Sequence, residues 1–387
     1  MKDNKLLFII LILLYIFGCK DKISNSEDID NPVGNIFLTA DSVKTLTIND
    51  FHVNLNNRGE LSYGSWNPGS YVSVIFRAGL WIGMEMNGES RGSIVCTKGM
   101  NPSNYTSQWE ERKLGVFNLK DGTNYSLDNW PVNYGAPVNN LGLPDIYGDE
   151  MCWTCLQSDT TMTNISPFEK PINNLRVTQA VYGYAKDDLS NVIFIKYGIT
   201  NLSSANWNNV YIGFFSDTDL YDALHNRTGY DLASSSTYTY DTLNNYVTGF
   251  TFLETPKDVG IGSHRIMRKN NYINPDFGEY SFNTPEQIIY TLKGLSNSGQ
   301  PMINPATGEV TNFAFTGDPI SRTGWLDTPV DVRSIISTKP FSLNPGETTW
   351  VTIAWIVTHG ATLENSLTKF KTQMNKIKSD ISLWQFN

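Results

Sequence analysis

The sequence predicts an all-β fold, a large antiparallel β-sandwich with long loops and one amphipathic helix at its C-terminus. Apolar and polar residues alternate along several segments, which is the pattern of half-buried strands. Aromatic residues make up 12% of the chain, and turn-forming pairs such as Asn-Gly separate the alternating segments. The chain of 387 residues shows no repeat of fixed period and no linker after residue 36. We therefore expect a single domain over residues 36–387.

Turn and strand signals follow one another along the chain. Two segments, 79–86 and 89–96, flank Asn87-Gly88, the strongest two-residue hairpin signal. Alternation over 191–201 and 348–360 gives each segment one apolar face, and 210–215 is a short apolar run. These two faces consist of Ile193, Ile195, Tyr197 and Ile199, and of Val351, Ile353, Trp355 and Val357. Further turns are expected at 56–59, 304–308 and 344–347.

The C-terminal segment predicts a helix over about 362–384, with Thr362 as its N-cap. Its apolar residues recur every three or four positions and form one stripe. The stripe consists of Leu363, Leu367, Phe370, Met374, Ile377, Ile381 and Trp384. The aromatic residues favour docking on the sandwich, and the alternative is a short coiled-coil seam to a partner.

The N-terminal segment is typical of an exported protein. Residues 1–18 carry two lysines and then twelve apolar residues, too few for a bilayer-spanning helix, which needs about 20. The stretch 16–19, Ile-Phe-Gly-Cys, resembles a bacterial lipobox, in which cleavage exposes a cysteine that receives diacylglycerol and a further acyl chain such as palmitate. We therefore predict a lipoprotein signal peptide over 1–18 and lipidation of Cys19. The alternatives are an uncleaved anchor or a buried cysteine.

Residues 19–35 are polar and acidic, and so predict a flexible tether that cannot bury a core. Lys20-Asp21 partly resembles the export signal of surface lipoproteins in Bacteroidota. We expect the protein to be lipid-anchored in the bacterial cell envelope, with the outer membrane as the favoured membrane. Whether it faces the periplasm or the cell surface stays open.

Charge and motifs exclude several classes of function. The net charge is −9 and there is no basic run, which argues against nucleic acid and against electrostatic docking to anionic lipid. Neither a GxSxG motif nor a glycine-rich phosphate loop is present. The four histidines stand apart in the sequence, at His52, His225, His264 and His359. Serine hydrolase and nucleotide-dependent chemistry are therefore not indicated.

Three cysteines remain after Cys19: Cys96, Cys152 and Cys155. The C-x-x-C spacing of the last two also occurs in redox and zinc sites, but no second such pair and no paired histidines accompany it. If this segment is a strand, the two thiols point to opposite faces. We interpret them as structural, with a disulfide to Cys96 and redox or metal chemistry as alternatives.

The segment 213–231 contains four aspartates, Asp217, Asp219, Asp222 and Asp231. Loop acids at alternate positions suit Ca²⁺, which takes six to eight oxygen ligands, so these four are candidate ligands of a structural Ca²⁺. The EF-hand pattern is absent. Two alternatives stay open: a solvated or hydrogen-bonded acidic turn, and a catalytic carboxylate set. Other acids, Asp149, Asp318 and Asp327, sit in turns, where aspartate commonly caps backbone groups.

Tryptophans fall into two groups. Trp66, Trp109, Trp130 and Trp207 lie in polar, loop-like contexts and are candidate ligand-binding aromatics. The alternative is that they cap the ends of the sandwich core. Trp81, Trp350 and Trp355 lie on predicted strands, and we assign them to the core.

Several phrases occur in an order that resembles a family of large secreted or cell-surface proteins of Bacteroidota and related lineages. They are GLWIG (79–83), DNWPVNYGAP (128–137), GDEMCW (148–153), NVYIGFFSDTDLYDA (209–223), TGDPISRTGW (316–325) and the segment 339–360. The resemblance runs from about residue 75 to the C-terminal helix and implies no particular activity. Relatives often end in a type IX secretion sorting domain, and we expect lipid anchoring in its place here. Where relatives read Asp-Pro-Asp-Leu-Gly-Asp, this chain has Thr218 for the proline and Tyr221 for the glycine.

Together these features favour a lipid-anchored cell-envelope protein with a non-enzymatic binding or structural role. The expected partner is a glycan or another envelope protein, and the only expected cofactor is structural Ca²⁺. The alternative is an extracellular glycoside hydrolase or lyase that uses loop carboxylates such as Asp217 or Asp219.

Overall fold

The computed structural model describes residues 37–38, 42–94, 113–120, 130–158, 170–268, 284–329 and 331–385. Residues 36–387 form one compact unit. The signal peptide, Cys19, the tether, Cys96 and Trp109 lie outside the described residues. Within the described part, no helix combines the length and the apolar character needed to cross a bilayer.

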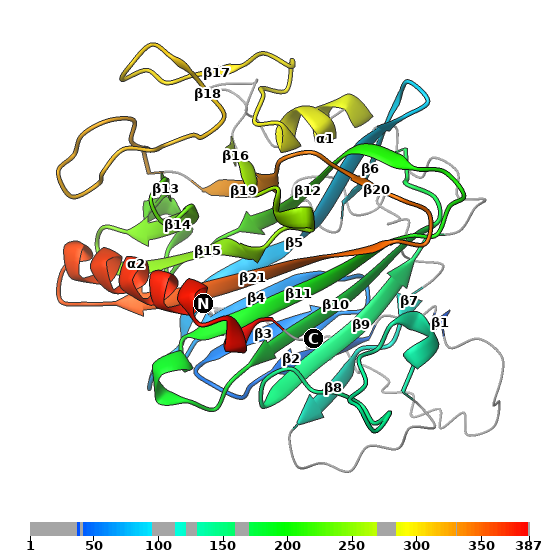
Figure 1. The fold of residues 1–387 in the computed structure, drawn as a ribbon. Helices are drawn as coiled ribbons and strands as arrows, with labels where there is room; N and C mark the ends of the chain where they lie inside the picture. The colour runs from blue at the N-terminus through cyan, green and yellow to red at the C-terminus, as the bar shows by residue number, and fades with distance from the viewer. Residues whose placement is uncertain are drawn as a thin grey trace, which may run out of the picture. The chain divides into compact units, whose positions relative to one another are not determined.

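The larger sheet has ten strands, all paired antiparallel (Figure 1). Its order is β1 (Phe37–Leu38), β7 (Lys113–Leu114), β9 (Glu150–Gln157), β10 (Leu175–Gly183), β11 (Val192–Asn201), β21 (Thr348–His359), β15 (Tyr246–Glu254), β14 (Ser236–Asp241) and β13 (Asn226–Asp231), with β8 (Phe117–Lys120) beside β9. We call it the first sheet.

The second sheet has nine strands, again antiparallel. Its order is β16 (Ile261–Arg268), β19 (Val332–Thr338), β12 (Trp207–Asp217), β5 (Val72–Met86), β4 (Leu61–Trp66), β3 (Phe51–Asn56) and β2 (Val43–Leu46), with β20 (Phe341–Leu343) beside β12 and β6 (Glu89–Ile94) beside β5. A separate two-stranded ribbon pairs β17 (Met302–Ile303) with β18 (Val310–Thr311). The predicted all-β architecture is confirmed.

The main core lies between the two sheets and follows the predicted alternation. The apolar faces of β11 and β21 enter it, including Ile195 and Trp355, both fully buried. They meet inward residues of the second sheet such as Phe214, whose ring lies edge-on to Trp355 at 5.9 Å. The Asn87-Gly88 hairpin is also confirmed. Both residues have positive φ, 53° and 77°, as a type I′ turn requires.

Helix α2 (Leu363–Ser379) covers the outer face of the first sheet over β15 and β21. Thr362 caps it as predicted, since its hydroxyl accepts a hydrogen bond from Asn365 N at 3.2 Å. The apolar stripe is buried against the sheet, including Phe370 and Met374. Docking on the sandwich, rather than a free coiled-coil seam, is therefore the arrangement in this fold.

Two details of the sequence prediction are wrong, the end of the C-terminal helix and the placement of Trp350. The α-helix ends at Ser379, and a 3₁₀ turn, Ile381–Leu383, follows it, in which the predicted stripe residue Ile381 is 55% exposed. Trp350 is not a core residue either. It lies on the outer face of β21, 38% exposed, with Lys196 Nζ 5.1 Å from its ring centre.

A second helix, α1 (Pro285–Leu292), was not predicted and covers the outer face of the second sheet. Its start does carry a sequence signal, a capping box between Thr284 and Gln287 followed by a proline at the first turn. The helix sits over strand glycines. A Cβ added at Gly83 or Gly213 would approach the Leu292 side chain to 2.7 or 2.4 Å.

Candidate functional site

The acidic segment 213–231 begins at the end of β12, where Asp217 lies directly opposite Arg333 of β19. Both side chains point to the same face of the second sheet as Phe215 and Ile335, which pack beneath α1. Asp331 stands two residues before Arg333, so it returns to that face. Strand pairing thus brings together residues more than a hundred positions apart in sequence.

A buried cluster of three carboxylates forms here. Ligand oxygens of Asp217, Asp219 and Asp331 all lie within 4.8 Å of one another. Arg333 donates to two of them, from Nη2 to Asp217 Oδ2 at 3.2 Å and from Nη1 to Asp331 Oδ1. Asp217 and Arg333 are both fully buried. Asp219 is only partly buried, so one buried guanidinium is paired with the two buried carboxyl groups of the three.

Carboxylate oxygens at this spacing are the donors that hard cations such as Ca²⁺ bind. The cluster could accordingly hold a metal ion, with backbone carbonyls or water completing the coordination. The guanidinium of Arg333 already supplies one positive charge on two of the three acids. Asp217 and Asp219 of the predicted ligand set are thus brought together, and Asp331 joins them.

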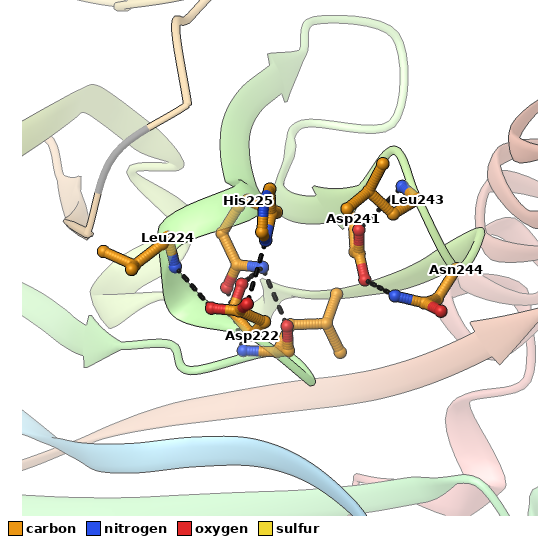
Figure 2. Close-up of polar contacts among 8 residues, drawn as sticks. Asp222, Leu224, His225, Asp241, Leu243 and Asn244 are labelled. Carbon is orange, nitrogen blue, oxygen red and sulfur yellow. Dashed lines mark hydrogen bonds and ion pairs between the residues drawn. The ribbon is translucent and has the colours of Figure 1, made fainter.

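The other two predicted ligands lie elsewhere. Asp222 caps a short 3₁₀ turn: Oδ1 accepts from Leu224 N at 3.0 Å, and Oδ2 lies 2.9 Å from His225 Nδ1 (Figure 2). Asp231 ends β13 and ties the sheet to α2, with Oδ1 2.7 Å from Lys371 Nζ. Burial alone would raise the pKa of Asp231, but hydrogen bonds from Lys371 and Ser234 hold it below its ordinary value.

The turn aspartates bind backbone groups, as expected. Asp149 accepts from Ala185 N at 2.7 Å, and Asp318 accepts from Ile320 N at 2.9 Å. Asp327 accepts from Thr228 N at 2.9 Å and pairs with Arg268 at 2.7 Å. These three carboxylates hold loops in place.

The candidate tryptophans have different environments. Trp130 and Trp207 are only 6% and 1% exposed, so neither offers an open ring face and the prediction of ligand binding by these two is wrong. Trp130 instead donates to Pro137 O at 2.8 Å and packs against Trp153. Trp66 is partly buried at the end of β4, with its ring edge-on to Tyr246 at 6.3 Å. For these described residues, capping the core is the better account.

Cys152 and Cys155 lie on opposite faces of β9, as the strand period predicted. Cys152 belongs to the core between the sheets, and Cys155 to the cluster beneath α2. Both thiols are free, and burial raises the pKa of each to about 12. Because the thiolate is the reactive form, these cysteines act as apolar packing residues.

Sequence reasoning missed Asp331 and Arg333. The only local signal is their alternate spacing, which puts both on one face of a strand. No feature of the sequence indicates that this strand pairs with β12, so the partnership with Asp217 comes from the topology alone.

No protein-family model matches the chain, and no curated protein matches its sequence. Three solved structures resemble it at low identity. A bacterial glucoamylase complexed with acarbose is 8% identical with a TM-score of 0.41, over 90% of this chain and 38% of that chain. A protein from Escherichia coli assigned as an aldose 1-epimerase is 8% identical with a TM-score of 0.38, over 83% of this chain and 100% of that chain. A Synechocystis protein is 7% identical with a TM-score of 0.39, over 86% and 100% respectively. The chain spans less than half of the glucoamylase, and likenesses of this strength carry no argument here.

Proposed function

We propose that this chain is a non-enzymatic binding or structural protein of the bacterial cell envelope, anchored by a lipid on Cys19. The non-enzymatic part of the proposal rests on the burial and the bonding of the candidate aspartates. Asp217 and Asp331 are buried and bonded to Arg333, whereas a glycosidase needs carboxylates that face its substrate across a cleft. Asp222 and Asp231 are likewise engaged, in a turn and in an ion pair to α2.

Purified protein incubated with a panel of soluble polysaccharides tests this part. We expect no release of new reducing ends and no unsaturated products. Product formation that is lost in Asp217→Asn or Asp219→Asn would instead establish the alternative, an extracellular glycoside hydrolase or lyase.

The anchored location rests on the lipobox-like stretch ending in Cys19, on the polar tether, and on the resemblance to envelope proteins. Metabolic labelling with an alkyne analogue of palmitate tests it. We expect label on the wild-type chain, recovered with outer membranes, and none on Cys19→Ser. Label that persists in Cys19→Ser would contradict the assignment.

The cofactor part of the proposal is a structural Ca²⁺ at Asp217, Asp219 and Asp331. A cation that binds only the native state adds RT ln(1 + [L]/Kd), about 2.7 kcal/mol at a hundredfold excess over Kd. We expect EDTA to lower Tm and Ca²⁺ to restore it. Asp219→Asn is the most informative variant, because it leaves the ion pairs of Arg333 with Asp217 and Asp331 in place. Equal melting with and without Ca²⁺ would mean that Arg333 alone balances the cluster.

A further inference from the structure

Four aromatic rings meet at one end of the sandwich, and we call them the ring stack: Trp66, Tyr221, Tyr246 and His359. The rings of Tyr221 and Tyr246 are nearly parallel, at 16° and 5.7 Å between centroids. Tyr246 in turn stacks on His359 at 24° and 4.4 Å, and Trp66 meets Tyr246 edge-on. The rings come from β4, β15, β21 and the loop after β12, so both sheets contribute.

Tyr221 is the outermost ring, 54% exposed although one face lies against Tyr246. Its φ is +57°, a left-handed conformation that favours glycine and that bulky residues rarely adopt. A large apolar ring is therefore displayed to solvent from a backbone that disfavours it. Neither burial nor local propensity explains a tyrosine at this position.

The loop that carries Tyr221 is fixed on both sides. The Asn226 side chain, which is buried, accepts from Leu220 N at 2.9 Å and donates to Leu220 O and Asp222 O at 2.8 and 2.9 Å. Leu220 is fully buried in the core, and Tyr221 N donates to Ser73 O at 3.0 Å. The ring is thus held in place before any ligand arrives, which reduces the ordering cost of binding.

Polar residues adjoin the ring stack in sequence: Asp222 and His225 follow Tyr221, and Asp241 and Asn244 precede Tyr246. Figure 2 shows Asp222 close to His225 and, in a separate segment, Asp241 close to Asn244. Asp222 and His225 are each nearly half exposed and pair at 2.9 Å, and Asn244 donates to Asp241 at 2.7 Å. A flat apolar ring with hydrogen-bonding groups at its margin matches a sugar ring, which has C–H faces and peripheral hydroxyls.

The segment before β3 contributes to a polar hollow of about 500 Å³. It is lined by Asp50, Lys186, Asp187 and neighbouring residues. Asp50 O accepts from Asn67 N at 2.8 Å, and Asn67 directly follows Trp66 of the ring stack. The lining of this hollow is therefore hydrogen-bonded to the segment that follows Trp66.

We propose that the ring stack binds a neutral pyranose glycan, with one sugar on the open face of Tyr221 and its hydroxyls on the polar margin. The proposal deepens the non-enzymatic binding role above and rests on it. The net charge of −9 and the acids Asp50, Asp187 and Asp222 favour a neutral over an anionic glycan. The cations nearby are Lys186, which lines the hollow, and Lys369, which donates to His359 O at 2.9 Å.

The test is calorimetric titration of the full chain, purified in mild detergent, with maltohexaose, cellohexaose, xylohexaose, mannohexaose and anionic polygalacturonate. Tyr221→Gly removes the ring and relieves the backbone, so it should fold at least as well as wild type. Tyr221→Phe keeps the ring. Tyr63→Gly is the matched control, since Tyr63 is also exposed, 64%, with φ of +48°, but packs on Phe76 outside the ring stack.

We expect wild type to bind at least one neutral hexasaccharide and Tyr221→Gly to bind it about tenfold more weakly. Tyr221→Phe and Tyr63→Gly should stay within about threefold of wild type. Three results would overturn the proposal: no binding of any neutral sugar, binding of polygalacturonate alone, or equal binding by Tyr221→Gly and wild type. The first of these results would leave a protein as the partner of this surface. The palmitate labelling of Cys19 is independent of these variants, so failure here is distinguishable from failure of the anchored assignment.

Discussion

Asp217 and Arg333 face each other across β12 and β19, with Oδ2 and Nη2 3.2 Å apart and both side chains fully buried. A buried ion pair contributes little net stability, because desolvation offsets the attraction. Removing one partner is different, since it leaves the other charge buried and uncompensated. Here the loss of the guanidinium would leave three clustered carboxyl groups.

Arg333→Met should therefore lower the free energy of unfolding by about 3–5 kcal/mol, measured by urea titration at neutral pH. The control is Arg77→Met, which breaks a pair to Glu60 at 3.0 Å whose arginine is 37% exposed. That variant should lose at most about 1 kcal/mol. Equal losses in the two variants would show that burial of the Arg333 cluster has no special energetic role.

His264 should make the fold sensitive to acid. Burial lowers its pKa to about 4, and its Nδ1 donates to Ala314 O at 2.9 Å. The unfolded chain, with an ordinary pKa near 6.5, binds the proton first. The contribution of neutral His264 to the free energy of unfolding is therefore complete above about pH 6.5. It falls by roughly 3 kcal/mol as the pH drops through 4.

Urea titrations between pH 7.5 and 4 test this point. His264→Phe should be less stable at neutral pH because it loses the hydrogen bond, yet its stability should change less with pH. An unchanged slope in His264→Phe would assign the acid sensitivity to other groups.

The thiols of Cys152 and Cys155 should be inert in the native state, because burial raises the pKa of each to about 12. Cys19→Ser/Cys96→Ser leaves them as the last two of the four cysteines. Ellman's reagent should detect no thiol in the folded variant and two after unfolding in guanidinium. No thiols after unfolding would reveal a disulfide between them, and rapid native reaction would refute their burial.

Docking of α2 should depend on Phe370, which is fully buried and whose ring centroid lies 6.1 Å from that of Tyr238. Phe370→Ala should cost about 3–5 kcal/mol through lost burial and a cavity. Ile381→Ala, at a stripe position that is 55% exposed, should cost under about 0.5 kcal/mol. Chemical unfolding of both variants tests the difference, and a large effect at Ile381 would place that residue in a contact that the structure lacks.

Much of the fold could be predicted because each strand carries its own pattern. Ile193, Ile195, Tyr197 and Ile199 enter the core as alternation requires. Trp350 shows where the pattern fails: its neighbours on β21 are buried on both faces, so hydrophobic character did not reveal which side stays open. Helix α1 was not predicted, because its eight residues are too few to show a clear helical period of apolar residues.

The candidate site was predicted only in part, for a physical reason. Asp217 and Asp219 are close in sequence, so their proximity could be inferred. Asp331 and Arg333 reach them through strand pairing between β12 and β19, which is a long-range contact. The ring stack depended in the same way on Tyr221, Tyr246 and His359 meeting from three separate segments.

The position of β21 has a consequence for how the chain acquires its structure. It is the last strand in chain order, yet it lies between β11 and β15 in the middle of the first sheet. Until residues 348–359 are available for pairing, the strands on its two sides stay in separate halves with unpaired inner edges. The first sheet can therefore be completed only once the C-terminal part of the chain has arrived, and the incomplete sheet is prone to aggregation until then.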